Sequence, residues 1–221
     1  MSEIIIHSGE RFEQVYLNEP GLDLHFVQEA GSTLKIHVLN IPDGTSGDRD
    51  IEISNNIVVE QIGEGCETEI YALAHLQGEA HVTTETHVKH AVGGGKSNQL
   101  LKFVLEDQAR GRFIGDLKIA PDAQKVEAHQ TNRNLLLSET AEMRTQPQLE
   151  IYADDVQATH GASTGQLDDS ALFYMQQRGI DKEKARQLLV GAFMKEVIEA
   201  IGDQHSAVRE QLLNAIDGVV E

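Results

Sequence analysis

Three of the ten histidines in this sequence, His81, His87 and His90, lie close enough together to suggest a metal site. Neutral imidazole is a common ligand for zinc, copper and iron. In an extended strand a spacing of six places His81 and His87 on one face, whereas His90 points to the other, so convergence requires a corner between them. The stretch also lacks the H-x-H pair of a cupin metal site. Solvent-facing strand histidines are the simpler interpretation, and cupin-like metal binding is an alternative.

A second candidate is the carboxylate pair Asp154 and Asp155, which precedes His160 by six and five residues. Paired carboxylates beside an imidazole can perform general acid–base catalysis, as in the grooves of β-helical enzymes that act on polysaccharides. Such enzymes also need cationic groups for an acidic substrate, and only Arg110 and Arg112 lie close together in this part of the chain. A β-helical polysaccharide-acting enzyme is therefore the second hypothesis.

The run Gly93-Gly94-Gly95-Lys96-Ser97 resembles the end of a phosphate-binding loop. That loop requires a further glycine at the position held by His90, and a helix where residues 98–103 have the pattern of a strand. The run is better explained as a glycine corner, and we assign no nucleotide to it.

The charge and cysteine content exclude several classes of function. The chain has 221 residues, and its 18 Lys and Arg against 36 Asp and Glu give a formal charge of −18. This excess would repel nucleic acid and anionic membranes. A lone Cys66 forms neither an internal disulfide nor a cysteine-rich metal site, and we interpret it as a small buried hydrophobe. Without a signal-peptide pattern or a long apolar run, we expect a cytoplasmic protein.

Alternating apolar and polar residues predict a mainly β body from about residue 12 to residue 157. No helix-length apolar stripe interrupts it, which argues against βαβ crossovers. Small or acidic corner clusters recur at steps of 13 to 17 residues, near positions 64, 79, 94, 107, 122, 139 and 154. Such a rhythm is typical of a solenoid, in which successive coils of β-structure, called rungs, stack on one another. A sandwich with regular hairpins has the same rhythm, so periodicity leaves both open.

Beyond residue 168 the pattern becomes helical. Asp168 to Ser170 offer N-cap acceptors, and helices are predicted over 171–178, 182–201 and 207–216. Gly179 is placed to end the first helix in the left-handed conformation. The second helix has an apolar stripe that packs on the body, docks a partner, or does both. We therefore predict a β core over 1–165 and a helical domain over 166–221.

One stretch is specific enough to indicate a family. Residues 151–180, IYADDVQATHGASTGQLDDSALFYMQQRGI, resemble the C-terminal signature of the SufB/SufD family, the scaffold proteins of the Suf iron–sulfur cluster assembly system, and within it the SufD side. Residues 94–102 and 129–137 also resemble the β-core of that family. The resemblance implies a right-handed parallel β-helix (a β-solenoid) followed by a small C-terminal α-helical domain, which resolves the choice between solenoid and sandwich.

The resemblance implies a scaffold rather than an enzyme. In the family, SufB and SufD pair through their β-helices, and each helical domain docks a SufC subunit, an ABC-type ATPase. The matching docking segment here contains Asp168, Phe173, Tyr174, Arg178, Gly179 and Phe193. ATP hydrolysis would then belong to the partner, in agreement with the incomplete phosphate-loop pattern.

The resemblance also singles out His160, which matches a SufD histidine implicated in a cluster site at the SufB–SufD interface. A neutral imidazole and a thiolate from another chain can together hold iron, so a transient iron–sulfur cluster would be shared with the partner. The alternative is that His160 only makes a hydrogen bond where the last rung meets the helices. Ala158 stands where many SufD-like sequences carry cysteine.

Family members are typically much longer, with an N-terminal helical domain and additional rungs. We therefore expect this chain to be a natural short form or a fragment. The exposed end of a solenoid must be capped or paired to avoid open-edge association. We predict that the chain dimerises, either with itself or with a longer SufB-like scaffold.

Overall fold

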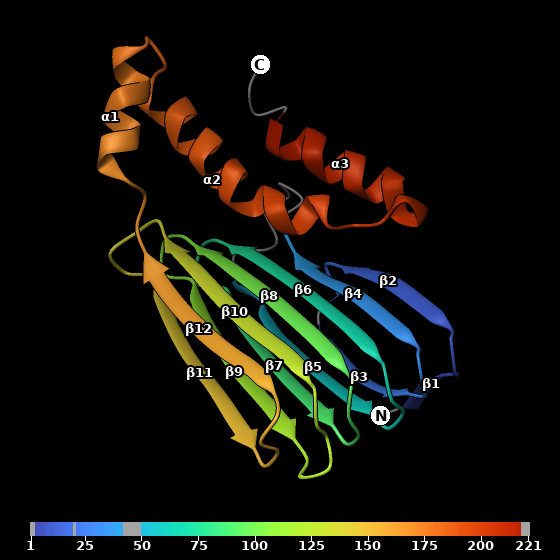
Figure 1. Cartoon of the computed structure of the whole chain (residues 1–221). Helices are drawn as coiled ribbons and strands as arrows, with labels where there is room; N and C mark the ends of the chain where they lie inside the picture. Colours follow the sequence, from blue (N-terminus) through green and yellow to red (C-terminus); the bar gives the residue numbers. More distant parts are fainter. Residues whose placement is uncertain (1–2, 20, 42–49, 218–221) are drawn as a thin grey trace.

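The protein is described by a computed structural model over residues 3–19, 21–41 and 50–217. Its strands form two six-stranded sheets in which every paired strand is parallel to its neighbour (Figure 1). Sheet A contains β1 (Glu3–Ile6), β3 (Gly21–Gln28), β5 (Glu52–Gln61), β7 (His81–His90), β9 (Arg110–Ile119) and β11 (Glu142–Ile151). Sheet B contains β2 (Arg11–Leu17), β4 (Thr33–Asn40), β6 (Glu67–Leu76), β8 (Lys96–Leu105), β10 (Glu127–Leu136) and β12 (Gln157–Gly165). Because consecutive strands alternate between the sheets, the chain is a β-solenoid, as the resemblance implied.

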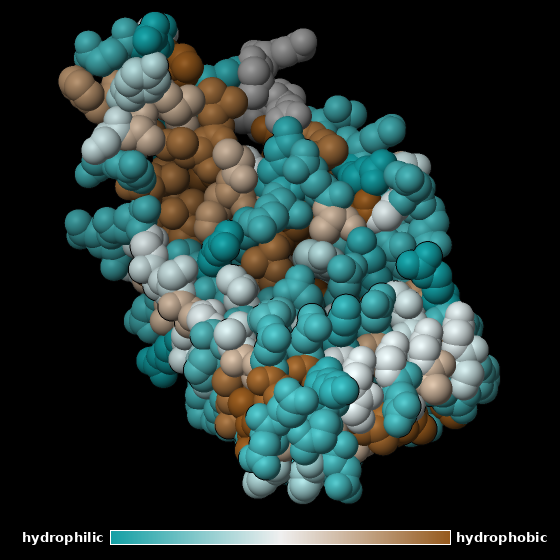
Figure 2. Space-filling model, in the orientation of Figure 1, coloured by the Kyte–Doolittle hydropathy of each residue, from teal (hydrophilic) through white to brown (hydrophobic). Residues whose placement is uncertain are grey.

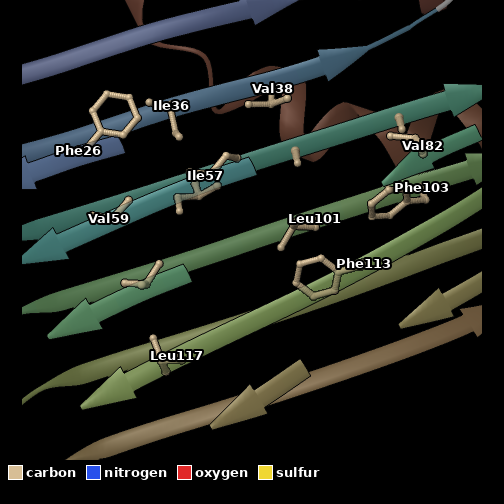
Figure 3. Close-up of a cluster of buried hydrophobic side chains, with 14 of the residues drawn as sticks. Phe26, Ile36, Val38, Ile57, Val59, Val82, Leu101, Phe103, Phe113 and Leu117 are labelled. Atoms are coloured by element: carbon tan, nitrogen blue, oxygen red, sulfur yellow. The ribbon is translucent and has the colours of Figure 1, made fainter. Parts of the chain in front are cut away.

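The core of the solenoid consists of columns of side chains that repeat from rung to rung. One column in sheet A runs from Phe26 through Val59 and Val88 to Leu117, and each member is the register partner of the next. All four are at most 1% exposed and lie between the two sheets (Figure 3 shows Phe26, Val59 and Leu117). Burial of these side chains therefore fixes the register between neighbouring strands, because a shift of one residue would move the apolar side chains of a strand to its outer face.

The corners fall where the sequence predicted them, and several require glycine. Gly65, Gly78 and Gly94 have φ between +67° and +70°, a region that favours glycine. A Cβ on Gly93 would lie 2.6 Å from the backbone oxygen of Gln124 in the next corner. The glycine run is therefore required by the close packing of two rungs.

The helices also begin and end close to their predicted positions. They are α1 (Asp169–Gln177), α2 (Lys182–Glu199) and α3 (Ser206–Asp217), with the 3₁₀ turn η2 (Asp203–His205) before α3. Asp168 caps α1 by accepting a hydrogen bond from the Ser170 amide at 2.8 Å, and Gly179 follows with φ +86°. No helix in the described parts of the chain is long and apolar enough to cross a membrane.

A second apolar core joins the helices to the outer face of sheet B (Figure 1). Leu39, Leu73 and Val104 come from the sheet, Val190, Met194, Val197, Ile198 and Leu212 come from α2 and α3, and Ile201 comes from the segment between them. The apolar stripe of α2 therefore packs on the body of its own chain.

Lys102 anchors α2 on the sheet through a polar contact inside this apolar layer. It is 3% exposed, and its ammonium donates to the Phe193 carbonyl at 2.7 Å and to Glu196 Oε2 at 2.6 Å. The same ammonium lies 4.9 Å from the centroid of the Phe193 ring. The hydrogen bond from Lys102 lowers the pKa of Glu196.

His37 lies between β4 and the helical layer without a hydrogen-bond partner for either ring nitrogen. It is 0% exposed and stacks on Tyr71, with ring centroids 4.9 Å apart and planes 7° apart. Burial, helped by the charges of Lys35 and His205, lowers the pKa of His37 to about 3.

We expect Lys102→Met to lower the free energy of unfolding by about 2 kcal/mol, because it removes the buried donor to the Phe193 carbonyl and leaves Glu196 only its contact with the more exposed Arg133, at 3.2 Å, among the described residues. Urea denaturation followed by circular dichroism measures the change. The control is Lys118→Met, which breaks the solvent-exposed pair Lys118–Glu150 (2.9 Å) and should cost much less. Equal losses in the two variants would contradict the anchoring role.

We expect acid to weaken the fold partly through His37. Its folded pKa lies below the ordinary value of 6.5, so the unfolded chain takes up the proton first, and stability falls as pH drops from about 6.5 toward 3. Between pH 7 and pH 4 this one group should remove about 3 kcal/mol, since each pKa unit is worth ~1.36 kcal/mol.

His37→Phe keeps an aromatic ring on Tyr71 and removes the proton site. Urea unfolding at pH 7, 6, 5 and 4 should show a shallower loss of stability in the variant. Other groups titrate equally in both proteins, so identical pH profiles would rule out this role for His37.

Candidate functional site

The solenoid ends in two edge strands. β11 pairs only with β9 and β12 only with β10, so each has one unpaired side among the described strands. Eight of the nine residues of β12 are exposed, and the ninth, Ala158, is half-buried. Long exposed edges present free backbone N–H and C=O groups to another chain, and proteins usually cover them. This end of the molecule is therefore a surface suited to strand pairing.

His160 lies in the middle of this edge. It is exposed, and its register partner in β10 is Gln130. No hydrogen bond or ion pair of its imidazole occurs within the described residues, so the structure offers no partner for the purely structural role considered above. The ring is free to contact a ligand or another chain.

A column of buried amides leads through the interior to His160. Gln99, Gln130 and His160 occupy successive register positions of β8, β10 and β12. Gln130 Nε2 donates to Gln99 Oε1 at 3.3 Å, whereas Gln130 Oε1 and Gln99 Nε2 are buried without a partner. On the opposite sheet, a Cβ at Gly115 would lie 2.4 Å from Gln130 Nε2, so this glycine makes room for the amide.

Buried polar side chains occur in several rungs, but the column that leads to His160 becomes polar only in the later ones. Asn132 and Asn134 are also buried and bond to each other, and the Asn134 amide also donates to Thr164 Oγ1 of β12 at 3.1 Å. In earlier rungs the column of Gln99 and Gln130 carries Ile36 and Ile70, and in β8 the register partners of the two asparagines are Leu101 and Phe103. Sequence analysis missed this change, although glutamine and asparagine at the inward positions of 96–105 and 127–136 were its visible signal.

The described residues contain no group of three or more His, Cys, Asp or Glu that could hold a metal ion. Cys66 is buried as predicted, with its Sγ 3.1 Å from the carbonyl oxygens of Glu29 and Gly63. It precedes β6, which β8 and β10 separate from β12 in sheet B. A metal or cluster at His160 would therefore need its other ligands from a second chain.

The three clustered histidines do not converge. His90 lies inside the solenoid, where its Nε2 is 2.9 Å from Ser97 Oγ and burial lowers its pKa to about 4. His81 is exposed at the start of β7. His87 lies on the outer face, 3.7 Å from both Glu85 and Asp116. This arrangement gives no support to cupin-like metal binding.

Asp154 and Asp155 lie at the corner between β11 and β12, at the opposite end of β12 from α1 (Figure 1). Both are exposed. The amide of Asp155 donates to Gln124 Oε1 at 2.9 Å, and its carbonyl accepts from the Lys125 amide at 2.6 Å. These bonds hold the corner in place, and the position does not favour the enzyme hypothesis.

The predicted docking segment divides into two parts. α1 buries none of its residues, and Phe173 and Tyr174 are 62% and 60% exposed. The Arg178 guanidinium lies 5.2 Å from the centre of the Tyr174 ring and donates to its hydroxyl at 3.0 Å. Phe193, by contrast, packs against Lys102 and the body. Figure 2 shows hydrophobic surface gathered over α1 and α2 at the upper left.

Comparison with known proteins places these features in a family. Residues 3–193 match the family model described as SUF system FeS cluster assembly, SufBD core domain. The chain is 37% identical over 164 residues to the iron-sulfur cluster assembly protein SufD of Escherichia coli (strain K12). The aligned region covers 74% of this chain and 38% of that protein. It is 33% identical over 224 residues to an iron-sulfur cluster assembly SufBD family protein of Mycobacterium leprae, covering 97% and 56%. The chain thus spans well under two thirds of each relative's length. It belongs to the SufBD family of iron–sulfur cluster assembly proteins.

Proposed function

We propose that this chain is a SufD-like scaffold subunit for iron–sulfur cluster assembly and not an enzyme. The observation that carries the proposal is His160, an exposed and unpartnered imidazole on an edge strand of a SufBD-family solenoid. The free edges of β11 and β12 can accept strands from a SufB-like scaffold, because backbone hydrogen bonding extends a sheet across two chains. A second copy of this chain is the alternative partner.

In this proposal the cluster is transient cargo shared between two chains. His160 supplies one ligand, and the partner supplies thiolates, which are the common ligands of iron–sulfur clusters. The buried amide of Gln130, the register partner of His160, supports this proposal. Its Oε1 has no hydrogen-bond partner among the described residues, so a polar group beside His160 is available to the site. Neutral amides tolerate this burial better than charged groups.

We further propose that α1 docks a SufC-like ABC ATPase, which would supply ATP hydrolysis. The exposed aromatic side chains of Phe173 and Tyr174 have no packing role within the described chain. Aromatic and arginine side chains are frequent hot spots of protein interfaces, and Arg178 lies beside them. We place the complex in the cytoplasm, with proteins as partners, since a charge of −18 disfavours nucleic acid and anionic membranes.

His160→Ala should reduce the rate of cluster formation at least ten-fold in the complex with a SufB-like scaffold and a SufC-like ATPase, because one ligand is lost. Visible absorbance during reconstitution with iron and a sulfur donor measures the rate. The control is His129→Ala, an imidazole on the outer face that is 2.8 Å from Thr159 Oγ1. A normal rate in folded His160→Ala would show that the imidazole is not a ligand.

The double variant Phe173→Ala, Tyr174→Ala should weaken binding of the ATPase at least ten-fold, since it removes the exposed aromatic surface of α1. Calorimetry measures the affinity, and the unfolding temperature should stay unchanged because neither side chain is buried. Gln176→Ala, Gln177→Ala on the same helix is the matched control. Unaltered affinity in the aromatic variant would exclude α1 as the docking element.

A further inference from the structure

The outer face of sheet A carries a cationic cluster that the proposed function does not use. Arg110 and Arg112 project from β9, and Arg144 projects from β11. His81 of β7 is the register partner of Arg110. All four side chains belong to exposed residues of a chain in which acidic residues outnumber basic ones two to one, 36 against 18.

Two of these arginines stand directly opposite each other. Arg112 and Arg144 are register partners in neighbouring strands, which lie about 4.8 Å apart in a sheet. Like charges in this relation are destabilising. Neither is well neutralised: the Arg112 guanidinium has no ion pair or hydrogen bond within the described residues, and Arg144 reaches only the exposed Glu142, at 3.6 Å.

A second pair of like charges on the same outer face is neutralised by carboxylates. Lys89 and Lys118 are also register partners. Each has its own carboxylate: Lys89 lies 3.0 Å from Glu60, and Lys118 lies 2.9 Å from Glu150. Among the described residues, the lack of an ion pair to Arg112 is therefore a local feature of this pair and not a general property of the sheet.

The shape of the surface adds a second observation. Arg112 and Arg144 both line two adjoining hollows, of about 230 and 240 Å³. Arg110, His81 and Thr83 line the first together with the carboxylates Glu52 and Glu142, whereas Phe113, Thr145 and Gln146 line the second. The paired guanidinium groups are thus shared by two small concave surfaces, and in the second, whose described lining contains no carboxylate, a compact anion can reach both.

The spacing of the pair favours phosphate over carboxylate. One guanidinium fork satisfies both oxygens of a carboxylate in a bidentate contact. A phosphate group has three peripheral oxygens and up to two negative charges, so it can accept from two guanidiniums on neighbouring strands at once. We propose that Arg112 and Arg144, with Arg110 and His81 at the rim, form a binding site for the phosphate group of a small phosphorylated ligand.

Thermal unfolding of the intact chain with inorganic phosphate, compared with chloride and acetate at equal ionic strength, tests the site. Phosphate at about ten times its Kd should raise the unfolding temperature by about 4 °C, and acetate should not. Arg112→Gln, Arg144→Gln should abolish this rise. Without phosphate and at low salt, the same variant should unfold at a higher temperature than the parent, because the repulsion is removed.

The matched control is Lys89→Gln, Lys118→Gln, which removes the same charge from the neutralised pair on the same face and should keep the response to phosphate. The proposal is overturned if phosphate does not stabilise the parent chain, if acetate stabilises it equally, or if the arginine variant responds like the parent. Cluster assembly plays no part in this readout, so the result is independent of the proposed function.

Discussion

The structure depends on one constraint, the in-register stacking of parallel strands from rung to rung. Each residue sits above its counterpart in the previous rung, so a single choice of inward or outward face is repeated along the whole solenoid. This repetition builds the apolar column from Phe26 to Leu117. It also forces the corners into the close contacts that only glycine allows, as at Gly93. Charges on the outside are subject to the same rule, and for that reason Lys89 and Lys118 each require a carboxylate.

The same constraint makes the last rung special. The strands from β3 to β10 pair on both sides, whereas β11 and β12, like β1 and β2 at the other end, each have one free side within the described chain. The column that leads to His160 becomes polar as this end is approached, because Gln99 and Gln130 replace the isoleucines of earlier rungs. An exposed edge, a polar interior and the unpartnered His160 therefore occur together. Their coincidence fits a surface that is completed by a second chain.

The helices form a layer on the outer face of sheet B, separate from the core between the two sheets. α2 and α3 share an apolar core with sheet B, and Lys102 fixes α2 through the Phe193 carbonyl and Glu196. α1 lies outside this core and leaves its aromatic residues in solvent. The helical region thus has a structural part that holds it to the body and an exposed part that is available to a partner.

The sequence by itself determined the local features: the strand rhythm, the corners, the helix caps at Asp168 and Gly179, and, through residues 151–180, the family. These follow from short-range chemistry, such as side-chain alternation and backbone preference. Only the tertiary structure decided which residues about thirty positions apart become neighbours, as in Gln130 with His160 or Arg112 with Arg144. Which residues pair depends on the number of residues in each corner between the two strands, and the corners differ in length. One residue more or less in a corner would turn the side chains of the next strand to the opposite face of the sheet. Local alternation therefore cannot specify them, and for the same reason it left solenoid and sandwich equally open.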